Sequence, residues 1–311
     1  MDKKKIGLGV ACAIISDVIF GFSYLFTKNI TNSVSSVTLL SWRFVLAFVV
    51  MIVLISFKVI KVNFRGKSLK PLLLIAAFHP VIYFIGETVG INLTTASESG
   101  TIIACVPIVT LLCSTLVLKE KPSIFQVSGI IITSLGVIVI VLVKGLEPSF
   151  QPLGYLMLTI AVVSYSLYSV YAQKTDEFTS VEKTFVMIAS GTIVFTTLAF
   201  VEHIRLGTVN EFISMPFTSG NFLITIVYLG VGSSVIAFLM ANIAISQLGT
   251  NRTASFVGIC TLVTVLSGVV ILKEEFSGLQ IIGTILVICG VYLANVQKKE
   301  VSDIQSTTLS Q

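Results

Sequence analysis

Residues 118–137 read LKEKPSIFQVSGIIITSLGV, and residues 272–291 read LKEEFSGLQIIGTILVICGV. A shift of 154 positions aligns their identical Leu-Lys-Glu triplets, which are followed in both copies by a serine, a glutamine and two glycines. Self-similarity at a fixed distance marks an internal repeat. Because one copy lies near the end of each half of the chain, we predict two related halves, residues 1–148 and 149–299.

Long apolar segments flank both copies and fill most of the chain. Hydrophobic residues make up 55% of the 311 residues and charged residues 11%, against about 25% charge in ordinary soluble domains. The apolar residues form blocks of about 20, enough to cross a hydrocarbon core as helices, and none alternates as a membrane β-barrel strand does. We predict ten transmembrane helices, over residues 6–28, 37–57, 71–92, 95–118, 124–143, 152–173, 184–203, 221–246, 251–272 and 278–296.

Each predicted half contains five helices, and this odd number fixes how the halves are related. After five crossings the second half must enter the membrane from the opposite side. Repeats related by an axis in the membrane plane are typical of transporters, because exchanging their tilts opens a central site to each side in turn. The expected fold is an all-α polytopic membrane protein with ten transmembrane helices in two inverted five-helix repeats. A duplicated bundle without a solute pathway is the alternative.

The basic residues predict the orientation of the chain in the membrane. With a cytoplasmic N-terminus, 15 of the 20 Lys and Arg residues lie on the cytoplasmic side and four lie outside, as the positive-inside rule requires. We therefore predict a multi-pass protein of the cytoplasmic membrane with both termini in the cytoplasm. Residues 300–311 are expected to form a short disordered cytoplasmic tail. The basic residues lie in short connections and form no patch for nucleic acid.

Ionisable side chains within the predicted helices are candidates for the solute pathway or for coupling, because they are costly at bilayer depth. Asp17 lies about 16 Å into the first helix at 1.5 Å per residue, and we expect it close enough to His79 to pair. The pair either ties two helices together or takes part in transport by changing protonation, since burial disfavours a charged form. Two polar helix faces contain these candidates: Asp17, Tyr24 and Lys28 in the first helix, and His79, Tyr83 and Glu87 in the third.

Charged residues near the helix ends are candidates for gates or ion pairs. Glu98 lies near the predicted outer start of the fourth helix, and Lys28 and Arg43 lie at comparable depth. Ion pairs of these cations with Glu98 or Glu87 would seal the outer side, and binding of a solute ammonium group by these carboxylates is the equal alternative. The repeat aligns Glu98 with Arg252 at the inner start of the ninth helix, which suggests a second gate there.

Asn242 is a further candidate for the solute pathway. It lies deep in the eighth predicted helix and shares a face with Ser234 and Phe238. A polar amide at this depth either bonds to a neighbouring helix or contacts a solute in a mostly apolar pocket. The sequence leaves these two roles open.

The usual signals of enzymatic chemistry are missing from the sequence. Neither histidine, His79 or His203, belongs to a His-Glu-x-x-His arrangement. The five cysteines lie within predicted helices and lack the spacing of metal ligands. We therefore predict that the protein is not an enzyme and that it has no catalytic residue, no metal and no cofactor.

Several short motifs resemble those of the EamA family of the drug/metabolite transporter superfamily. The resemblance covers residues 6–296 and implies ten helices in two inverted repeats, with export of a solute across the cytoplasmic membrane. One departure is that Thr261 stands where the repeat of Pro107 would fall, so the halves are expected to bend differently. The motifs are Phe20-Gly21-Phe22-Ser23 through Lys28, Trp42-Arg43-Phe44 with Ala47, and Thr94-Thr95-Ala96-Ser97 leading to Pro107.

The sequence and this resemblance together lead to a functional expectation. We expect a secondary transporter that exports a small metabolite by alternating access, with the lipid bilayer and the solute as its partners. Facilitated diffusion and proton antiport both remain open, and the buried ionisable residues favour antiport. A non-transporting membrane sensor or binding protein is the alternative. Amino acids, amines and other small solutes are all compatible with the sequence, as are a monomer and a homodimer.

Overall fold

The computed structural model describes residues 3–31, 33–118, 124–145 and 150–295, and every regular element in these ranges is helical. Helices form because the apolar blocks must satisfy their own backbone hydrogen bonds where no water is available. The elements in chain order are α1 (Lys3–Thr31), α2 (Ser36–Ser56), α3 (Lys70–Ala76), η1 (Ala77–Ile82), α4 (Tyr83–Leu93), α5 (Ala96–Ile103), α6 (Val106–Leu118), α7 (Ile124–Gly145), α8 (Pro152–Gln173), α9 (Ser180–Leu206), α10 (Val209–Thr218), α11 (Gly220–Val227), η2 (Tyr228–Ala237), α12 (Phe238–Leu248), α13 (Thr250–Ala254), α14 (Val257–Val270) and α15 (Gly278–Asn295).

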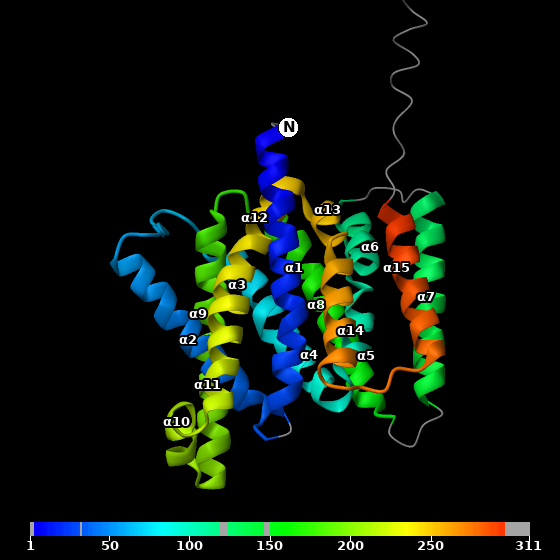
Figure 1. Cartoon of the computed structure of the whole chain (residues 1–311). Helices are drawn as coiled ribbons and strands as arrows, with labels where there is room; N and C mark the ends of the chain where they lie inside the picture. The colour runs from blue at the N-terminus through cyan, green and yellow to red at the C-terminus, as the bar shows by residue number, and fades with distance from the viewer. Residues whose placement is uncertain (1–2, 32, 119–123, 146–149, 296–311) are drawn as a thin grey trace, which may run out of the picture.

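Eight helical segments of the described chain are long and apolar enough to cross a membrane. Two shorter apolar stretches, Val127–Ile140 in α7 and Gly278–Leu293 in α15, run beside them (Figure 1). The all-α polytopic fold is therefore confirmed, and the count of ten crossings stays a prediction. The eight segments are Lys4–Thr31, Ser36–Ser56, Lys70–Leu93, Ala96–Val117, Pro152–Gln173, Ser180–Leu206, Gly220–Leu248 and Thr250–Val270.

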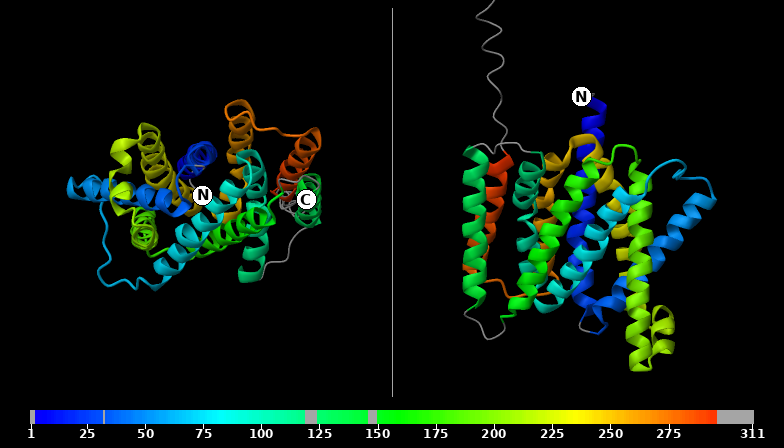
Figure 2. Two further views of the ribbon diagram at one scale, coloured as in Figure 1. Left: turned by 90° about the horizontal axis from the view of Figure 1, so that it is seen from below. Right: turned by 180° about the vertical axis from the view of Figure 1, so that it is seen from behind.

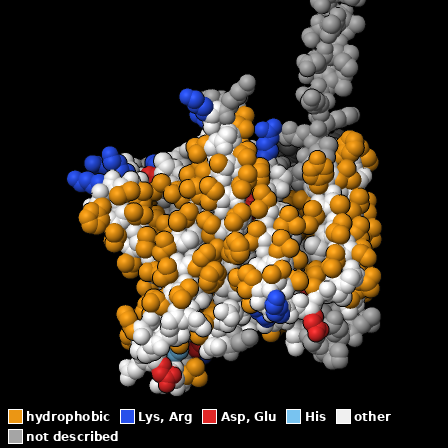
Figure 3. All heavy atoms as spheres, viewed as in Figure 1, with side chains coloured by type: hydrophobic (Ala, Val, Ile, Leu, Met, Phe, Trp, Pro, Cys, Tyr) orange, Lys and Arg blue, Asp and Glu red, His pale blue; other side chains and the backbone are white. Residues whose placement is uncertain are grey.

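The surface of the bundle has the polarity expected of a protein embedded in lipid. Hydrophobic side chains cover the middle of the visible face, and most visible Lys, Arg, Asp and Glu side chains lie toward its upper and lower edges (Figure 3). Large apolar residues such as Leu116 and Ile193 are 79% and 69% exposed. A soluble monomer rarely exposes a contiguous apolar surface of this extent, so lipid is its natural environment.

The two halves of the chain pack against each other in a reciprocal way (Figures 1 and 2). Helix α1 of the first half packs against η2, α12 and α14 of the second, and α8 of the second half packs against η1, α4 and α6 of the first. Helix α2 pairs with α9, and α7 pairs with α15. This reciprocity is what two halves related by a two-fold axis produce. The start of α1 and the end of α15 lie at the same edge (Figure 1).

Four of the membrane-crossing segments are interrupted. The third and eighth predicted helices contain the π-helical turns η1 and η2, which often mark functional sites. The fourth is broken between α5 and α6, just before Pro107, and the ninth between α13 and α14, well before Thr261. The break in the fourth follows from the missing N–H of Pro107. Both helices are therefore interrupted near their starts, although only the fourth has a proline beside its break, and different bending of the two halves stays a prediction.

The structure differs from the prediction at one short helix, and two predicted segments cannot be compared with it. The short helix α10 was not predicted, because its ten residues are too few to cross a membrane. Residues 119–123, which include the first Lys-Glu pair, and the predicted tail 300–311 lie outside the described residues.

Candidate functional site

A small closed cavity lies among helices of both halves. Its volume is about 20 Å³, which is room for about one water molecule. Three of the predicted site residues, Asp17, His79 and Tyr83, line it together. The remaining lining residues are Phe20, Ile103, Val106, Tyr165, Val257 and Cys260.

His79 reaches this cavity because the third helix is interrupted at its position. Its backbone is extended, with φ −138° and ψ 110°, and Pro80 follows it. A residue before proline is disfavoured in the helical conformation, so the chain breaks here and the imidazole turns into the bundle. The ring is 2% exposed and lies 4.8 Å from the ring of Tyr168 between centroids. Its Nδ1 atom has no hydrogen-bond partner among the residues that the structure describes.

Asp17 and His79 share the cavity but do not form the hydrogen bond that the sequence predicted. Among the described residues, no hydrogen bond or ion pair reaches the Asp17 carboxylate, which is 6% exposed. The prediction brought the two side chains near each other, since both line this cavity, but the turn of the chain at Pro80 was not visible in a helical projection. The Asp17 carboxyl group and the His79 Nδ1 atom therefore both lack a hydrogen bond to any other described side chain.

A second polar cluster lies beside the cavity and contains four of the predicted residues, namely Tyr24, Arg43, Tyr83 and Glu87. The Tyr83 hydroxyl donates a hydrogen bond of 2.7 Å to Glu87 Oε1, and the Tyr24 hydroxyl lies 3.5 Å from that of Tyr83. Arg43 interacts electrostatically with Glu87. All four side chains are buried, so this polar cluster belongs to the protein interior.

Arg43 does not form the predicted ion pair. Its Nε donates to Ser234 Oγ at 2.8 Å and its Nη2 donates to Ser233 Oγ at 2.7 Å. Its guanidinium carbon lies 4.1 Å from the centre of the Phe84 ring. The serines of η2 were not assigned this role from the sequence, because only the fold brings the second and eighth helices together.

Asn242 ties helices together in this structure. Its Oδ1 accepts a hydrogen bond of 3.0 Å from the Tyr168 hydroxyl, and its Nδ2 donates to Thr184 Oγ1 and to the Phe238 carbonyl, both at 3.1 Å. These partners come from α8, α9 and α12. Asn242 is therefore engaged between helices and does not line the cavity.

The predicted gate residues lie apart from the cavity. Lys28 Nζ donates to the backbone carbonyls of Ile91, Asn92 and Thr94, at the end of α4. The ion pair between Lys28 and Glu98 is not formed: among the described residues, the single ion pair joins Lys67 to Glu182 at 2.9 Å. Cations near a helix C-terminus satisfy its free carbonyls, and this explains the position of Lys28.

Glu98 belongs to a contact between the halves at the start of α5. It completes a capping box with Thr95 and accepts a hydrogen bond of 3.0 Å from Gln280 Nε2. Glu274 accepts hydrogen bonds from the backbone N–H groups of Ala96 and Ser97 and from the Ser97 hydroxyl. Glu274 and Gln280 belong to the repeated motif, and their role in joining the halves was missed. Arg252, the predicted counterpart of Glu98, lies exposed in α13.

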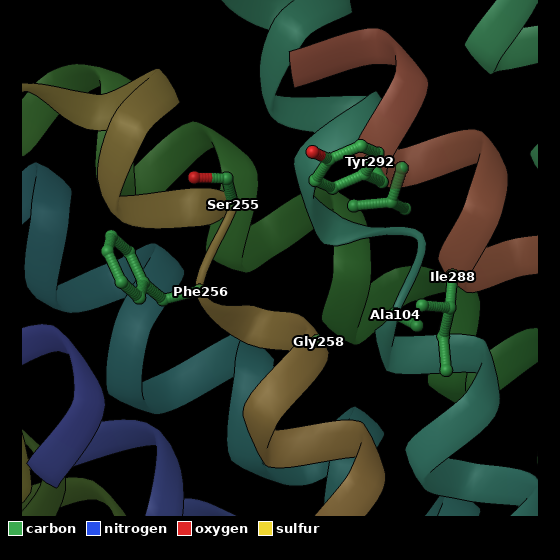
Figure 4. A pocket seen from close by; sticks show the side chains of 7 residues that line it. Ala104, Ser255, Phe256, Gly258, Ile288 and Tyr292 are labelled. Carbon is green, nitrogen blue, oxygen red and sulfur yellow. The ribbon is translucent and has the colours of Figure 1, made fainter. Parts of the chain in front are cut away.

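A much larger cavity, of about 420 Å³, lies between α15 and the breaks of the fourth and ninth helices (Figure 4). None of the predicted site residues lines it, and its lining includes no charged side chain among the described residues. The lining residues are Ala104, Ser255, Phe256, Gly258, Ile288, Val291 and Tyr292. Neither cavity contains a cluster of three or more His, Cys, Asp or Glu side chains that could hold a metal, within the described residues.

Comparisons with known proteins identify the chain's relatives. The model of the EamA-like transporter family matches twice, over residues 7–142 and 152–296. An uncharacterized transporter of Bacillus subtilis, YcxC, is 32% identical over 286 residues, which cover 91% of each chain. An uncharacterized transporter of Archaeoglobus fulgidus is 22% identical over 281 residues, which cover 88% of this chain and 94% of its own.

The fold itself also has a solved counterpart. A crystal structure superimposes on the whole of this chain, over the whole of its own length, with a TM-score of 0.62 at 18% identity. At this level of identity the likeness shows a shared fold. Together with the two family matches, it places the cavity within a fold that relatives share.

Proposed function

Because the chain belongs to the EamA-like transporter family, and is thus a membrane transporter, we propose that it is a secondary carrier that exports a small metabolite by alternating access. The two matches to the family model support two inverted five-helix repeats, residues 1–148 and 149–299. The reciprocal packing of the halves supports the same arrangement. The carrier resides in the cytoplasmic membrane with both termini in the cytoplasm.

The observation that carries this proposal is the closed cavity between the halves. It combines apolar walls with Asp17 and His79, whose polar groups have free bonding capacity within the described residues. Binding sites of carriers lie near the bilayer midplane at the interface of repeats, beside interrupted helices. A cavity of about 20 Å³ is too small for a metabolite, so the proposal requires this cavity to widen before the solute binds.

Proton antiport is the coupling that we propose, and Asp17 is the residue that carries the proton. In a largely apolar cavity, a carboxyl group is more stable in its neutral, protonated form when no cation is near. Binding of a solute to the same carboxylate would then displace that proton. His79, Tyr83, Tyr165 and Cys260 are the other titratable groups that face this cavity. Facilitated diffusion is the alternative mechanism.

Flux across liposomes tests the proposal. Purified protein is reconstituted, and the movement of radiolabelled amino acids and amines is followed with and without a pH gradient. We expect uptake or release of at least one solute class, accelerated by a proton gradient of opposite direction. Asp17→Asn should abolish the acceleration, whereas Glu211→Gln, an exposed position on α10, should leave it unchanged. A sensor on the same scaffold would bind a solute and move none.

A further inference from the structure

The charges of the central cavity indicate the class of solute that it takes. Asp17 is the one carboxyl side chain in its lining, and no Lys or Arg of the described residues lines it. A buried carboxylate without a hydrogen bond or a counter-ion is costly. A positive charge on the solute would offset this cost, and a negative charge would increase it.

Aromatic rings form much of the wall around Asp17. Phe20, Tyr83 and Tyr165 line the cavity, and the ring centroids of Tyr83 and Tyr165 are 5.7 Å apart. The His79 ring meets that of Tyr165 edge-on at 5.4 Å. Faces of aromatic rings attract cations through their quadrupoles, more strongly where water is excluded. The wall therefore suits an organic cation.

His79 supplies a hydrogen-bonding atom at the same place. Its Nδ1 is buried without a partner, and in one neutral tautomer this atom accepts a hydrogen bond. An ammonium group between Asp17 and His79 would donate to both. A carboxylate in the same position would face Asp17 and find no cation in the lining.

Arg43 does not supply the missing cation. It donates to Ser233 and Ser234, and its guanidinium lies over the Phe84 ring. An anion could recruit it only by breaking these buried contacts. A solute that bears a carboxylate, such as an amino acid, is therefore disfavoured at this site.

The helix breaks provide room for the apolar part of the solute. Ile103 and Val257 line the central cavity. Their chain neighbours Ala104, Phe256 and Gly258 line the larger cavity of about 420 Å³. The breaks of the fourth and ninth helices thus lie between the linings of the two cavities. A shift of either break would join them and admit an apolar body beside Asp17.

We propose that the central cavity binds a monovalent organic ammonium ion with an apolar body and no carboxylate, its ammonium group held by Asp17 and His79 within the aromatic wall. The biological role of this binding rests on the proposed transport function. Binding itself requires only that the central cavity widens.

Three probes that share a phenylethyl group isolate the charge requirement. They are 2-phenylethylammonium, phenylalanine and 3-phenylpropionate, and their affinities for the purified full-length protein are measured by titration calorimetry at neutral pH. We expect the amine to bind at least tenfold more tightly than either carboxylate-bearing probe. Equal or tighter binding of phenylalanine or 3-phenylpropionate would overturn the proposal, and so would no binding of the amine at millimolar concentration.

Variants connect this selectivity to the cavity. Asp17→Asn keeps the size of the side chain and removes its charge, so affinity for the amine should fall at least tenfold, whereas the exposed control Glu211→Gln should bind as the wild type does. An unchanged affinity in Asp17→Asn would contradict the proposal. If that variant does not fold, the comparison of the three probes on the wild-type protein still decides the question.

Flux measured with the same probes separates this inference from the proposed function. Transport of phenylalanine without binding of the amine would refute the ammonium site and leave the carrier function standing. Asp17-dependent binding of the amine with no flux of any solute would support the ammonium site and refute the carrier function. The site would then belong to a protein that binds a solute but does not transport it.

Discussion

Arg43 shows how a single charged side chain is accommodated in the interior of this bundle. Its side chain is 1% exposed, and its planar guanidinium donates to two serines while it covers the Phe84 ring. This combination of directed donors and stacking is specific to arginine, whose fork geometry lysine does not reproduce. The nearby Glu87 adds an electrostatic interaction.

Replacement of Arg43 should therefore be costly. Arg43→Met removes both hydrogen bonds that the charged guanidinium donates, so we expect a loss of about 1.5–3 kcal/mol in unfolding free energy. Arg43→Lys should also destabilise, because it keeps the charge but not the fork. Unfolding in mixed micelles measures the change. Arg205→Met, at an exposed position, is the control, and equal stabilities of the two Met variants would show that the Arg43 contacts contribute nothing.

Asn242 gives a second prediction at the residue scale. Asn242→Leu keeps the volume but leaves the hydroxyls of Tyr168 and Thr184 without these buried partners, so we expect a loss of about 1–3 kcal/mol. Because Asn242 does not line the cavity, the affinity for a bound amine should change little in protein that remains folded. The exposed Asn221→Leu serves as the control. A large loss of affinity without loss of stability would instead indicate that Asn242 contacts the solute.

The sequence allowed part of this residue-level picture to be predicted. Counting 1.5 Å per residue along each helix led us to expect Asp17 and His79 near each other, and both line the small cavity. This counting could not predict their partners, because the direction of His79 depends on the extended backbone before Pro80. The partners of Arg43 were equally hidden, since Ser233 and Ser234 lie about 190 residues further along the chain.

Among the elements, the pair α7 and α15 is held together by glycines of the repeated motif. A Cβ atom on Gly290 would lie 2.6 Å from the Thr133 backbone nitrogen, and one on Gly136 would lie 2.6 Å from the Gly283 carbonyl oxygen. The helix backbones are therefore in direct contact, as is common where small residues face each other between membrane helices.

Gly290→Ala tests this packing against a matched position in the same helix. The added methyl group must push α15 away from backbone atoms of α7, so we expect a loss of about 1–3 kcal/mol. Gly278→Ala is the control, because nothing lies within 4 Å of its added Cβ atom. That change should be neutral or slightly stabilising, since alanine favours helix over glycine by about 1 kcal/mol. Equal thermal stabilities of the two variants would disprove the close contact.

Long elements were easier to predict than short or interrupted ones. The predicted helix 152–173 coincides with α8, and the prediction 37–57 differs from α2 by one residue at each end, because the length of an apolar block is set by the bilayer. The π-helical turn η2 contains no proline, and its two glycines and two serines are equally compatible with a loosened helix and with close packing of a regular one. Such turns depend on packing between helices, which one segment's periodicity does not contain.

For the whole molecule, one edge of the bundle is closed by contacts between the halves. Glu274 of the second half binds the first N–H groups of α5, and Gln280 binds Glu98. On the same edge, a Cβ atom on Gly268 of α14 would lie 3.2 Å from the Ser97 nitrogen of α5 and would contact the Ser97 hydroxyl. The alternating access that we propose would require these contacts to separate during each cycle, because they hold α5 against α14.

A disulfide between these helices should therefore stop transport. Ser97→Cys combined with Gly268→Cys places two Cβ atoms within about 4 Å, the range that a disulfide spans. We expect the oxidised double variant to lose solute flux in liposomes and to regain it after reduction. Each single variant, treated with the same oxidant, controls for the five native cysteines. Full flux through protein whose cross-link is verified by mass spectrometry would mean that this edge stays closed throughout the cycle, and the solute would then have to pass without rocking of the two halves.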